Sequence, residues 1–423
     1  MNPYPEYKNS GLSWLGKVPK HWEIEKLKFN ARVRFSNVNK KTEEGEIPVK
    51  LCNYVDVYYN SVIGPDIEFM EASASLEEIK KFQLRAGDVL ITKDSEEWTD
   101  IAVPAHVVID IQNLLCGYHL AQIRSENRLR GDFLFWLLSS NQINYQFKIE
   151  ASGVTRYGLS NHALSNSIVL LPPVEEQKRL TDFLKTKTAQ IDDIISKKEK
   201  MVELLKEERA AIINQAVTKG LDPKVELKDS GIPWLSKIPK HWEKVPLKWN
   251  LQIVSGDSLA IESVLSEPVG QNDIPVIGGN GVMGYTNTSN ITSPTVVVGR
   301  VGALCGNVHY IEPAAWITDN ALRVKNVTKY SLKYLVLLLA TMDLNKLANQ
   351  NAQPLITGTL VKKQVAPLPP LEEQTQIISY VSQQTGQIDA QILREKKSID
   401  LLRDYRAALI SEVVTGKIDV RGI

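Results

Sequence analysis

The chain has 423 residues with a hydrophobic content of 43%, enough to form more than one domain core. Its 50 basic and 49 acidic residues leave a formal charge of +1, so composition alone does not indicate a polyanion-binding protein. The three cysteines lie far apart and form no CxxC pair, which argues against a zinc site and a disulfide framework. The N-terminus is polar and no apolar run is long enough to span a bilayer, so we expect a cytoplasmic protein without membrane contact.

In chain order, the first element is a segment that occurs twice. Residues 8–28 read KNSGLSWLGKVPKHWEIEKLK and residues 228–248 read KDSGIPWLSKIPKHWEKVPLK, so that His21 corresponds to His241 at an offset of 220. Tryptophans and prolines recur at matching positions, which is typical of an irregular segment anchored by aromatic side chains. No acidic or hydroxyl partner repeats beside the two histidines, so we expect them to pack and cap rather than to catalyse.

Two regions of mixed strand and helix character follow the two copies, and their sequences differ. In the first region we predict a strand at 47–59, a turn and strand at 84–92, a helix at 132–139, and polar stretches at 36–46, 93–100 and 151–161. In the second region we predict glycine-interrupted strands at 274–285 and 295–306, a helix at 330–342 and a loop at 353–360. The polar stretch 221–229 is expected to link the two halves.

A second repeated segment closes each half. Residues 171–222 begin LPPVEEQ and return as residues 368–419, which begin LPPLEEQ, so that Pro172 corresponds to Pro369 at an offset of 197. Prolines followed by glutamates predict a helix start, because acidic groups there face the positive end of the helix dipole. Apolar residues then recur at helical spacing, and each stripe is interrupted by an arginine, Arg209 or Arg406. The stripe residues are Ile191, Ile195, Val202, Leu205, Ile212 and Ala216, and in the second copy Ile388, Ile392, Ile399, Leu402, Leu409 and Val413.

These helices define the predicted architecture. A helix from 188 to 218 would be about 47 Å long and could not bury its stripe alone, so we predict that the two copies pack antiparallel about a pseudo-twofold axis. The alternative is two ordinary helices, each packed within its own domain. The predicted fold class is α/β (α+β), with two variable domains separated by the two long helices in a tandem repeat. The predicted boundaries are 1–170 for the first variable domain, 171–222 for the first helical region, 223–367 for the second variable domain and 368–423 for the second helical region.

Two stretches fit catalytic motifs without the context that the chemistry needs. Residues 279–284 fit GxGxxG, but a polar loop is predicted after them in place of the helix that binds a dinucleotide. Asp66 with Glu78 and Lys80 fits a metal-nuclease pattern, but the second part lies in a predicted capped helix rather than a strand. The sequence contains no Walker motif and no Asn-Pro-Pro-Tyr tetrapeptide. No catalytic, cofactor-binding or metal-binding residue is therefore predicted, and the sequence favours a binding protein.

Polar loops of the variable regions carry candidate DNA-binding side chains. Basic groups suit phosphates, whereas arginine, asparagine and serine can also contact base edges. For each of them the alternative is an ordinary solvated loop residue. The candidates are Lys40, Lys41, Lys93, Ser95, Arg156 and Tyr157 in the first region, and Asn280, Tyr285, Asn287, Arg300 and Thr357 in the second.

The tandem order of the repeats resembles that of specificity subunits of type I restriction–modification systems. The resemblance rests on the paired GLSWLGKVPKHW and GIPWLSKIPKHW segments and on the paired LPPVEEQ and LPPLEEQ helices, which end AVTKG and VVTGK. It implies that the variable regions are target-recognition domains, that each reads one half of a split site in double-stranded DNA, and that the helices set the spacer. It also implies that the helical regions dock two methyltransferase subunits. The residues expected to take part are Glu175, Glu176, Gln177, Glu372, Glu373 and Gln374.

The same resemblance implies that this chain is a non-catalytic subunit without a cofactor of its own. Methyltransferase subunits would bind S-adenosylmethionine and methylate adenine, and restriction subunits that use ATP can complete such a complex. Two alternatives stay open. One is a scaffold that pairs two proteins without reading DNA, and the other is a metal-dependent nuclease that requires Asp66.

Overall fold

The computed structural model describes residues 2–349 and 354–422. The chain forms two compact units, Met1–Lys198 with Lys397–Ile423, and Glu199–Lys396, and each of two long helices contributes one part to each unit. Of the loop predicted at 353–360, Gln353 lies outside the described residues. Within the described ranges, no helix combines the length and the apolar character required to cross a membrane.

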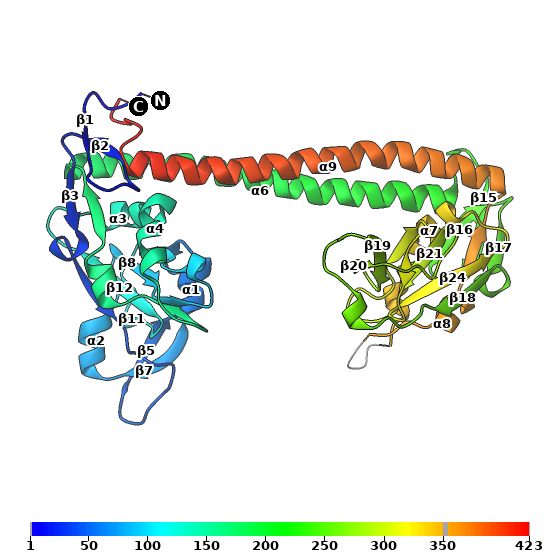
Figure 1. Cartoon of the computed structure of the whole chain (residues 1–423), viewed down its shortest axis with the longest axis horizontal. Coiled ribbons are helices and arrows are strands. Elements are labelled where there is room, and N and C mark those ends of the chain that lie inside the picture. Colours follow the sequence, from blue (N-terminus) through cyan, green and yellow to red (C-terminus); the bar gives the residue numbers. More distant parts are fainter. Residues whose placement is uncertain (1, 350–353, 423) are drawn as a thin grey trace. The chain divides into compact units, whose positions relative to one another are not determined.

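The core of the first unit is built around strand β8 (Asp88–Thr92), which confirms the turn and strand predicted at 84–92 and is buried along its whole length. This strand is the middle one of a five-stranded sheet with the order β4 (Ala31–Phe35), β12 (Leu120–Ser125), β8, β10 (Pro104–Val107) and β6 (Val62–Ile63). Figure 1 shows β8 and β12 in the body of this unit. A smaller sheet has the order β11 (Leu114–Cys116), β5 (Ile47–Cys52) and β7 (Met70–Ala74). Apolar side chains from both sheets share one core, so they form a single domain.

Short helices complete the first unit. α3 (Gly131–Ser139) confirms the helix predicted at 132–139 and buries every side chain from Phe133 to Leu138. α2 (Leu76–Phe82) confirms the predicted capped helix, because the Ser75 hydroxyl accepts a hydrogen bond from the Glu78 N–H in a capping box. α4 (Asn141–Glu150) and α5 (Asn161–Ser165) follow α3 in the chain.

The strand predicted at 47–59 is wrong in its second half. β5 ends at Cys52 and helix α1 (Tyr54–Tyr59) follows. The reason is a capping box, in which the Asn53 N–H donates to the Asp56 carboxylate at 2.7 Å. This local start signal overrides the strand preference of the valine and tyrosines that follow.

The second unit has a related but smaller plan. Its main sheet has the order β18 (Leu251–Ser255), β24 (Ala321–Val327), β21 (Thr295–Gly299) and β22 (Val308–Ile311). A second sheet has the order β20 (Gly281–Thr286), β19 (Ile274–Gly278) and β23 (Trp316–Ile317). β19 and β20 form a hairpin, so the GxGxxG stretch lies in a strand turn and opens no helix. The helices are α7 (Leu332–Thr341), which confirms the helix predicted at 330–342, and α8 (Gly358–Lys363), which occupies part of the stretch predicted as a loop.

The repeated N-terminal segments form short strands that tie each domain to its long helix. In the first unit β1 (Tyr7–Asn9) pairs with β2 (Lys17–Pro19), and β3 (Glu23–Lys26) pairs with β14 (Ile168–Leu171), which leads into the helix. In the second unit β15 (Leu227–Ile232) pairs with β16 (Leu235–Pro239), and β17 (Glu243–Pro246) pairs with β25 (Val365–Leu368). The end of the predicted linker 221–229 is thus part of a strand. Single 3-10 turns lie at Leu27–Phe29, Trp98–Asp100, Leu247–Trp249, Ile261–Ser263 and Leu344–Leu347.

The long helices are α6 (Val174–Lys219) and α9 (Leu371–Val414), and both begin directly after the prolines with two glutamates in the first turn. In the first unit, Arg406 of α9 forms an ion pair of 2.8 Å with Asp192 of α6. In the second unit, Arg209 of α6 forms an ion pair of 2.8 Å with Asp389 of α9. The two pairs are related by the repeat offset, which explains the arginine that interrupts each stripe.

Within each unit the helical segments run antiparallel. In the first unit the start of α6 lies beside the end of the chain, since Tyr4 donates to Glu176 and its ring lies under Arg421. In the second unit the start of α9 lies beside the end of α6, because Glu373 lies next to Gly220. Most of the predicted stripe is buried, namely Ile191, Ile195, Val202, Leu205, Ala216, Ile388, Ile399, Leu409 and Val413.

Candidate functional site

In the first unit the structure brings together four of the predicted DNA-binding residues. Strand β9 (Asp94–Ser95) pairs with β13 (Tyr157–Gly158), so that Tyr157 lies opposite Ser95. Lys93 and Arg156 directly precede these strands. A two-residue ladder between polar stretches gave no strand pattern in the sequence, and only pairing in the fold reveals it.

The charges of this group are partly paired. The Asp94 carboxylate accepts from His119 Nδ1 at 2.9 Å and forms an ion pair of 3.0 Å with Arg156. The ammonium of Lys93 lies over the aromatic rings of Phe35 and Tyr118, at 5.3 and 4.7 Å from their centroids. Burial lowers the pKa of Lys93, and the nearby carboxylate of Asp94 opposes that shift. His119 and Arg156 both pair with Asp94, whereas Lys93 forms no ion pair with a carboxylate of the described residues.

Lys40 and Lys41 lie elsewhere in the first unit, in the segment before β5. Both are exposed, and the Lys41 carbonyl accepts from the Ser73 N–H at 3.4 Å. Neither residue belongs to the ladder of β9 and β13 or directly precedes one of its strands. Ser95 is buried and its hydroxyl accepts from the Glu97 N–H, so its side chain has a local role in the turn.

In the second unit, three predicted residues lie together. Arg300 directly follows β21, and its guanidinium donates to the Ser255 hydroxyl at 2.8 Å and to the Asp319 carbonyl at 3.2 Å. The carbonyl of Arg300 accepts from the Ile356 N–H at 2.8 Å, which places Thr357 beside it. Asn280 lies in the turn before β20. Gly279, the residue before it, packs against Gly299, the residue before Arg300. Thr357 caps α8 through its hydroxyl, so its side chain also has a structural role.

Tyr285 and Asn287 lie at the opposite end of β20. The backbone of Tyr285 exchanges hydrogen bonds with Leu265, and Asn287 is exposed just after the strand. The structure thus does not place these two residues in the group around Arg300. The DNA-binding role of every candidate remains a prediction.

Each of the repeated histidines has an acidic partner in the fold, although none recurs beside it in the sequence. Glu176, only 6% exposed, accepts from the Tyr4 hydroxyl at 2.7 Å, from Trp22 Nε1 at 3.0 Å and pairs with His21 Nε2 at 2.8 Å. In the second copy, the Glu373 carboxylate accepts a hydrogen bond from Trp242 Nε1 and pairs with His241 Nε2, both at 2.9 Å. The partners come from the other repeated segment, so inspection of neighbouring residues in the sequence could not find them.

These clusters hold each frame together, as do the glutamines that follow the glutamates. Gln177 is fully buried and binds the N–H of Arg130 and the carbonyls of Arg128 and Pro172. Gln374 repeats this pattern with Ser331, Lys329 and Pro369. Both glutamines and the two paired glutamates therefore have internal contacts, whereas Glu175 and Glu372 are exposed. A role of any of the six in partner binding stays a prediction.

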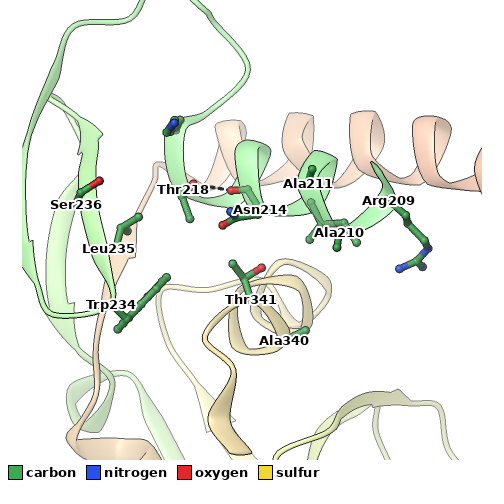
Figure 2. A pocket seen from close by; sticks show the side chains of 12 residues that line it. Arg209, Ala210, Ala211, Asn214, Thr218, Trp234, Leu235, Ser236, Ala340 and Thr341 are labelled. Atoms are coloured by element: carbon green, nitrogen blue, oxygen red, sulfur yellow. Dashed lines mark hydrogen bonds between the residues drawn. The ribbon is translucent and has the colours of Figure 1, made fainter. Parts of the chain in front are cut away.

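A cavity of the second unit lies between the end of α6, β16 (Leu235–Pro239) and the end of α7, and Figure 2 shows it. Its volume is about 740 Å³, and Arg209, Asn214, Thr218, Trp234 and Thr341 are among its lining residues. None of the residues that line it is a carboxylate, a cysteine or a histidine. Its polar groups include the hydroxyls of Thr218, Ser236 and Thr341 and the cations of Arg209 and Lys219.

The metal-nuclease pattern also finds no support in the local geometry. The Glu78 carboxylate accepts from the N–H and the hydroxyl of Ser75, at 3.0 and 2.8 Å, and so serves its own helix cap. Among the described residues, no group of three or more histidine, cysteine, aspartate or glutamate side chains is arranged to hold a metal ion.

Two unlike domains on a duplicated frame, each with a polar group at the end of its central strand, define a tandem two-domain recognition protein. The family model described as type I restriction modification DNA specificity domain matches residues 31–204 and 239–398. The chain therefore belongs to the family of type I restriction–modification specificity proteins.

Individual relatives agree with this assignment over the whole chain. The putative type I restriction enzyme MjaX specificity subunit of Methanocaldococcus jannaschii is 25% identical over 430 aligned positions, which cover 96% of each chain. One solved chain comes from a study of complex assembly and conformational transition of the type I restriction–modification system. It superposes with a TM-score of 0.72 at 18% sequence identity, and the match covers 95% of this chain and 99% of that chain. The HsdS subunit of Thermoanaerobacter tengcongensis superposes with a TM-score of 0.53 at 18% sequence identity, and the match covers 97% of this chain and 100% of that chain. These structures share the fold of this chain.

Proposed function

We propose that this chain is the subunit that gives a type I restriction–modification complex its DNA sequence specificity, with each target-recognition domain reading one half of a split site in double-stranded DNA. The observation that carries this proposal is the combination of two repeated frames with two different domains. The frames share the same glutamate, glutamine and tryptophan contacts, whereas the domains between them differ in sheet size and in loops. A repeated frame with unlike contents suits a site whose two halves have different sequences.

Under this proposal the chemistry belongs to the partners. Two methyltransferase subunits would dock on the helical regions, bind S-adenosylmethionine and methylate adenine, and restriction subunits would use ATP. The present chain would contribute binding and positioning without a cofactor.

Methylation mapping tests the proposal directly. The chain is co-expressed with its neighbouring methyltransferase subunit, and modified bases are located by sequencing the host DNA. The expected result is one split motif with methyl-adenine in each half, and no such motif when this chain is omitted. A continuous motif, or methylation that does not depend on this chain, would favour the scaffold alternative.

The spacer of the split motif is expected to depend on the length of the long helices. Four residues inserted after Lys200 of α6 and after Lys397 of α9, which are equivalent positions, keep the two copies matched. Each insertion lengthens its helix by about 6 Å, which corresponds to one or two base pairs at about 3.4 Å per pair. We expect a motif with unchanged halves and a longer spacer in the methylation map. An unchanged spacer would show that these helices do not measure it.

A further inference from the structure

The central strands of the two recognition domains are topological equivalents. In the first unit β8 pairs with β12, which pairs with β4, and in the second unit β21 pairs with β24, which pairs with β18. The ladders align Thr92 with Leu120 in one domain and Gly299 with Ala321 in the other. The residues that directly follow these strands, Lys93 and Arg300, therefore occupy the same position in both folds, although their surrounding sequences differ.

The backbones of Lys93 and Arg300 are held by matching hydrogen bonds. The Lys93 N–H donates to the His119 carbonyl at 3.2 Å, and the Arg300 N–H donates to the Asn320 carbonyl at 3.0 Å. The carbonyl of Lys93 accepts from the Leu159 N–H, and that of Arg300 from the Ile356 N–H, both at 2.8 Å. Leu159 and Ile356 are themselves related by the offset of the long helices, as Pro172 and Pro369 are. The equivalence thus rests on two backbone contacts and on the repeat.

The residues that follow Leu159 and Ile356 are equivalent as well. Ser160 caps α5 by accepting from the Ala163 N–H at 3.0 Å, and Thr357 caps α8 by accepting from the Leu360 N–H at 3.3 Å. In each domain a short capped helix therefore lies next to the basic residue and fixes the backbone around it. The basic side chains are placed by the common fold and not by the variable loops.

The two side chains share a charge but not their neighbours. Lys93 lies over Phe35, the last residue of β4, whereas Arg300 donates to Ser255, the last residue of β18. Within the described residues, neither cation forms an ion pair with a carboxylate, although Arg124 and Arg156 in the first unit do. Among the described residues, the two side-chain contacts of Arg300 both use Nη1, which leaves Nε and Nη2 without a partner there. Positive charge is thus common to this position while the surroundings vary between the domains.

We propose that Lys93 and Arg300 are matched phosphate anchors, one in each recognition domain, which hold the two half-sites at the same place on their domains without reading their sequence. This inference rests on the proposed function. The DNA backbone is the feature that all half-sites share, so a residue placed by the shared fold suits a phosphate. Residues that read bases should instead differ in chemistry between two domains with different targets.

The test uses the complex of the full chain with its methyltransferase subunit and a duplex that carries the mapped motif. Lys93→Met and Arg300→Met remove the charge while keeping an apolar stem. Lys20→Met and Lys240→Met are matched controls, because these repeat-equivalent lysines are already paired with Glu6 and Glu226 at 2.7 and 3.0 Å. Lys93→Arg and Arg300→Lys retain the charge. Dissociation constants are measured over a range of salt concentrations, and thermal unfolding verifies that every variant folds.

We expect each anchor variant to weaken binding about tenfold at about 0.1 M salt and to lower the slope of log K against log salt by about one, whereas the controls leave both unchanged. The mapped motif should stay the same for all variants, and the charge-retaining variants should bind like the original chain. A folded anchor variant that binds like its control overturns the proposal. So does a change in the preferred base, or a loss of specificity in Arg300→Lys, because lysine does not reproduce the planar pair of donors with which an arginine contacts a base. If the unaltered complex recognises no split motif, the proposed function itself fails, and that result is distinct from the others.

Discussion

Replacing Glu176 with alanine is expected to destabilise the first unit by about 3 kcal/mol, because several donors lose their acceptor at once. The Glu176 carboxylate is 6% exposed, and the Trp22 indole that donates a hydrogen bond to it is completely buried. Burial, reinforced by the hydrogen bond to Glu176, raises the pKa of Tyr4, so this hydroxyl remains a donor that needs a partner. Urea denaturation followed by hydrogen exchange of peptides measures the loss separately for each unit.

Two further variants make this prediction specific. Glu175→Ala removes the same charge from an exposed neighbour and should change stability by less than about 0.5 kcal/mol. Glu373→Ala should destabilise the second unit by about 1–2 kcal/mol, a smaller effect, because Glu373 is 21% exposed and receives two side-chain donors in place of three. If Glu176→Ala were as mild as Glu175→Ala, the cluster would not stabilise the frame.

Exchanging one recognition domain for that of a relative is expected to change one half of the methylated motif completely and to leave the other half and the spacer unchanged. The structure shows where to cut. β17 and β25 belong to the frame, and the Leu247 N–H donates to the Gln364 carbonyl at 2.9 Å where the frame meets the domain. Residues 250–364 can therefore be replaced without breaking the strand ladder or the long helix. Methylation mapping of the hybrid reads out both halves.

The reciprocal exchange is the matched control. In the first unit the Leu27 N–H donates to the Ser167 carbonyl at 2.8 Å, in the same place relative to β3 and β14. Replacement of residues 30–167 should therefore change the other half of the motif. If either exchange altered both halves, or neither, the assignment of one half-site to each domain would be incorrect.

Periodicity and repetition made the frame predictable. The start of each long helix and its buried stripe follow from residues close together in the sequence, and the equivalence of Arg209 and Arg406 follows from the repeat. The structure confirms all three. The partner of His21 could not be predicted in this way, because Glu176 lies 155 residues away and only the fold brings them together. The helix at Tyr54–Tyr59 was missed because its residues favour strands and its cap depends on Asn53 and Asp56.

The recognition surface was only partly predictable, for a related reason. Their place in polar loops predicted Lys93 and Arg300 as separate DNA-binding candidates, but the two domains share no sequence pattern that would align these residues. Their equivalence appears only when the strand ladders and the backbone contacts of Leu159 and Ile356 are compared. Backbone pairing between distant segments carries this information, and composition does not.

The way the chain is divided between the units has a consequence for its synthesis. The second unit is one continuous stretch, Glu199–Lys396, whereas the first unit needs both ends of the chain, and Asp419 donates its N–H to the carbonyl of Asn2 at 2.9 Å. Figure 1 shows these two ends side by side. A ribosome makes the N-terminal residues first, yet it releases the last helix segment of their unit only after the whole second unit has been synthesised. The part of the protein that is synthesised first is therefore the part that completes its fold last. Until then, the apolar stripe at the start of α6 is not covered by the end of α9.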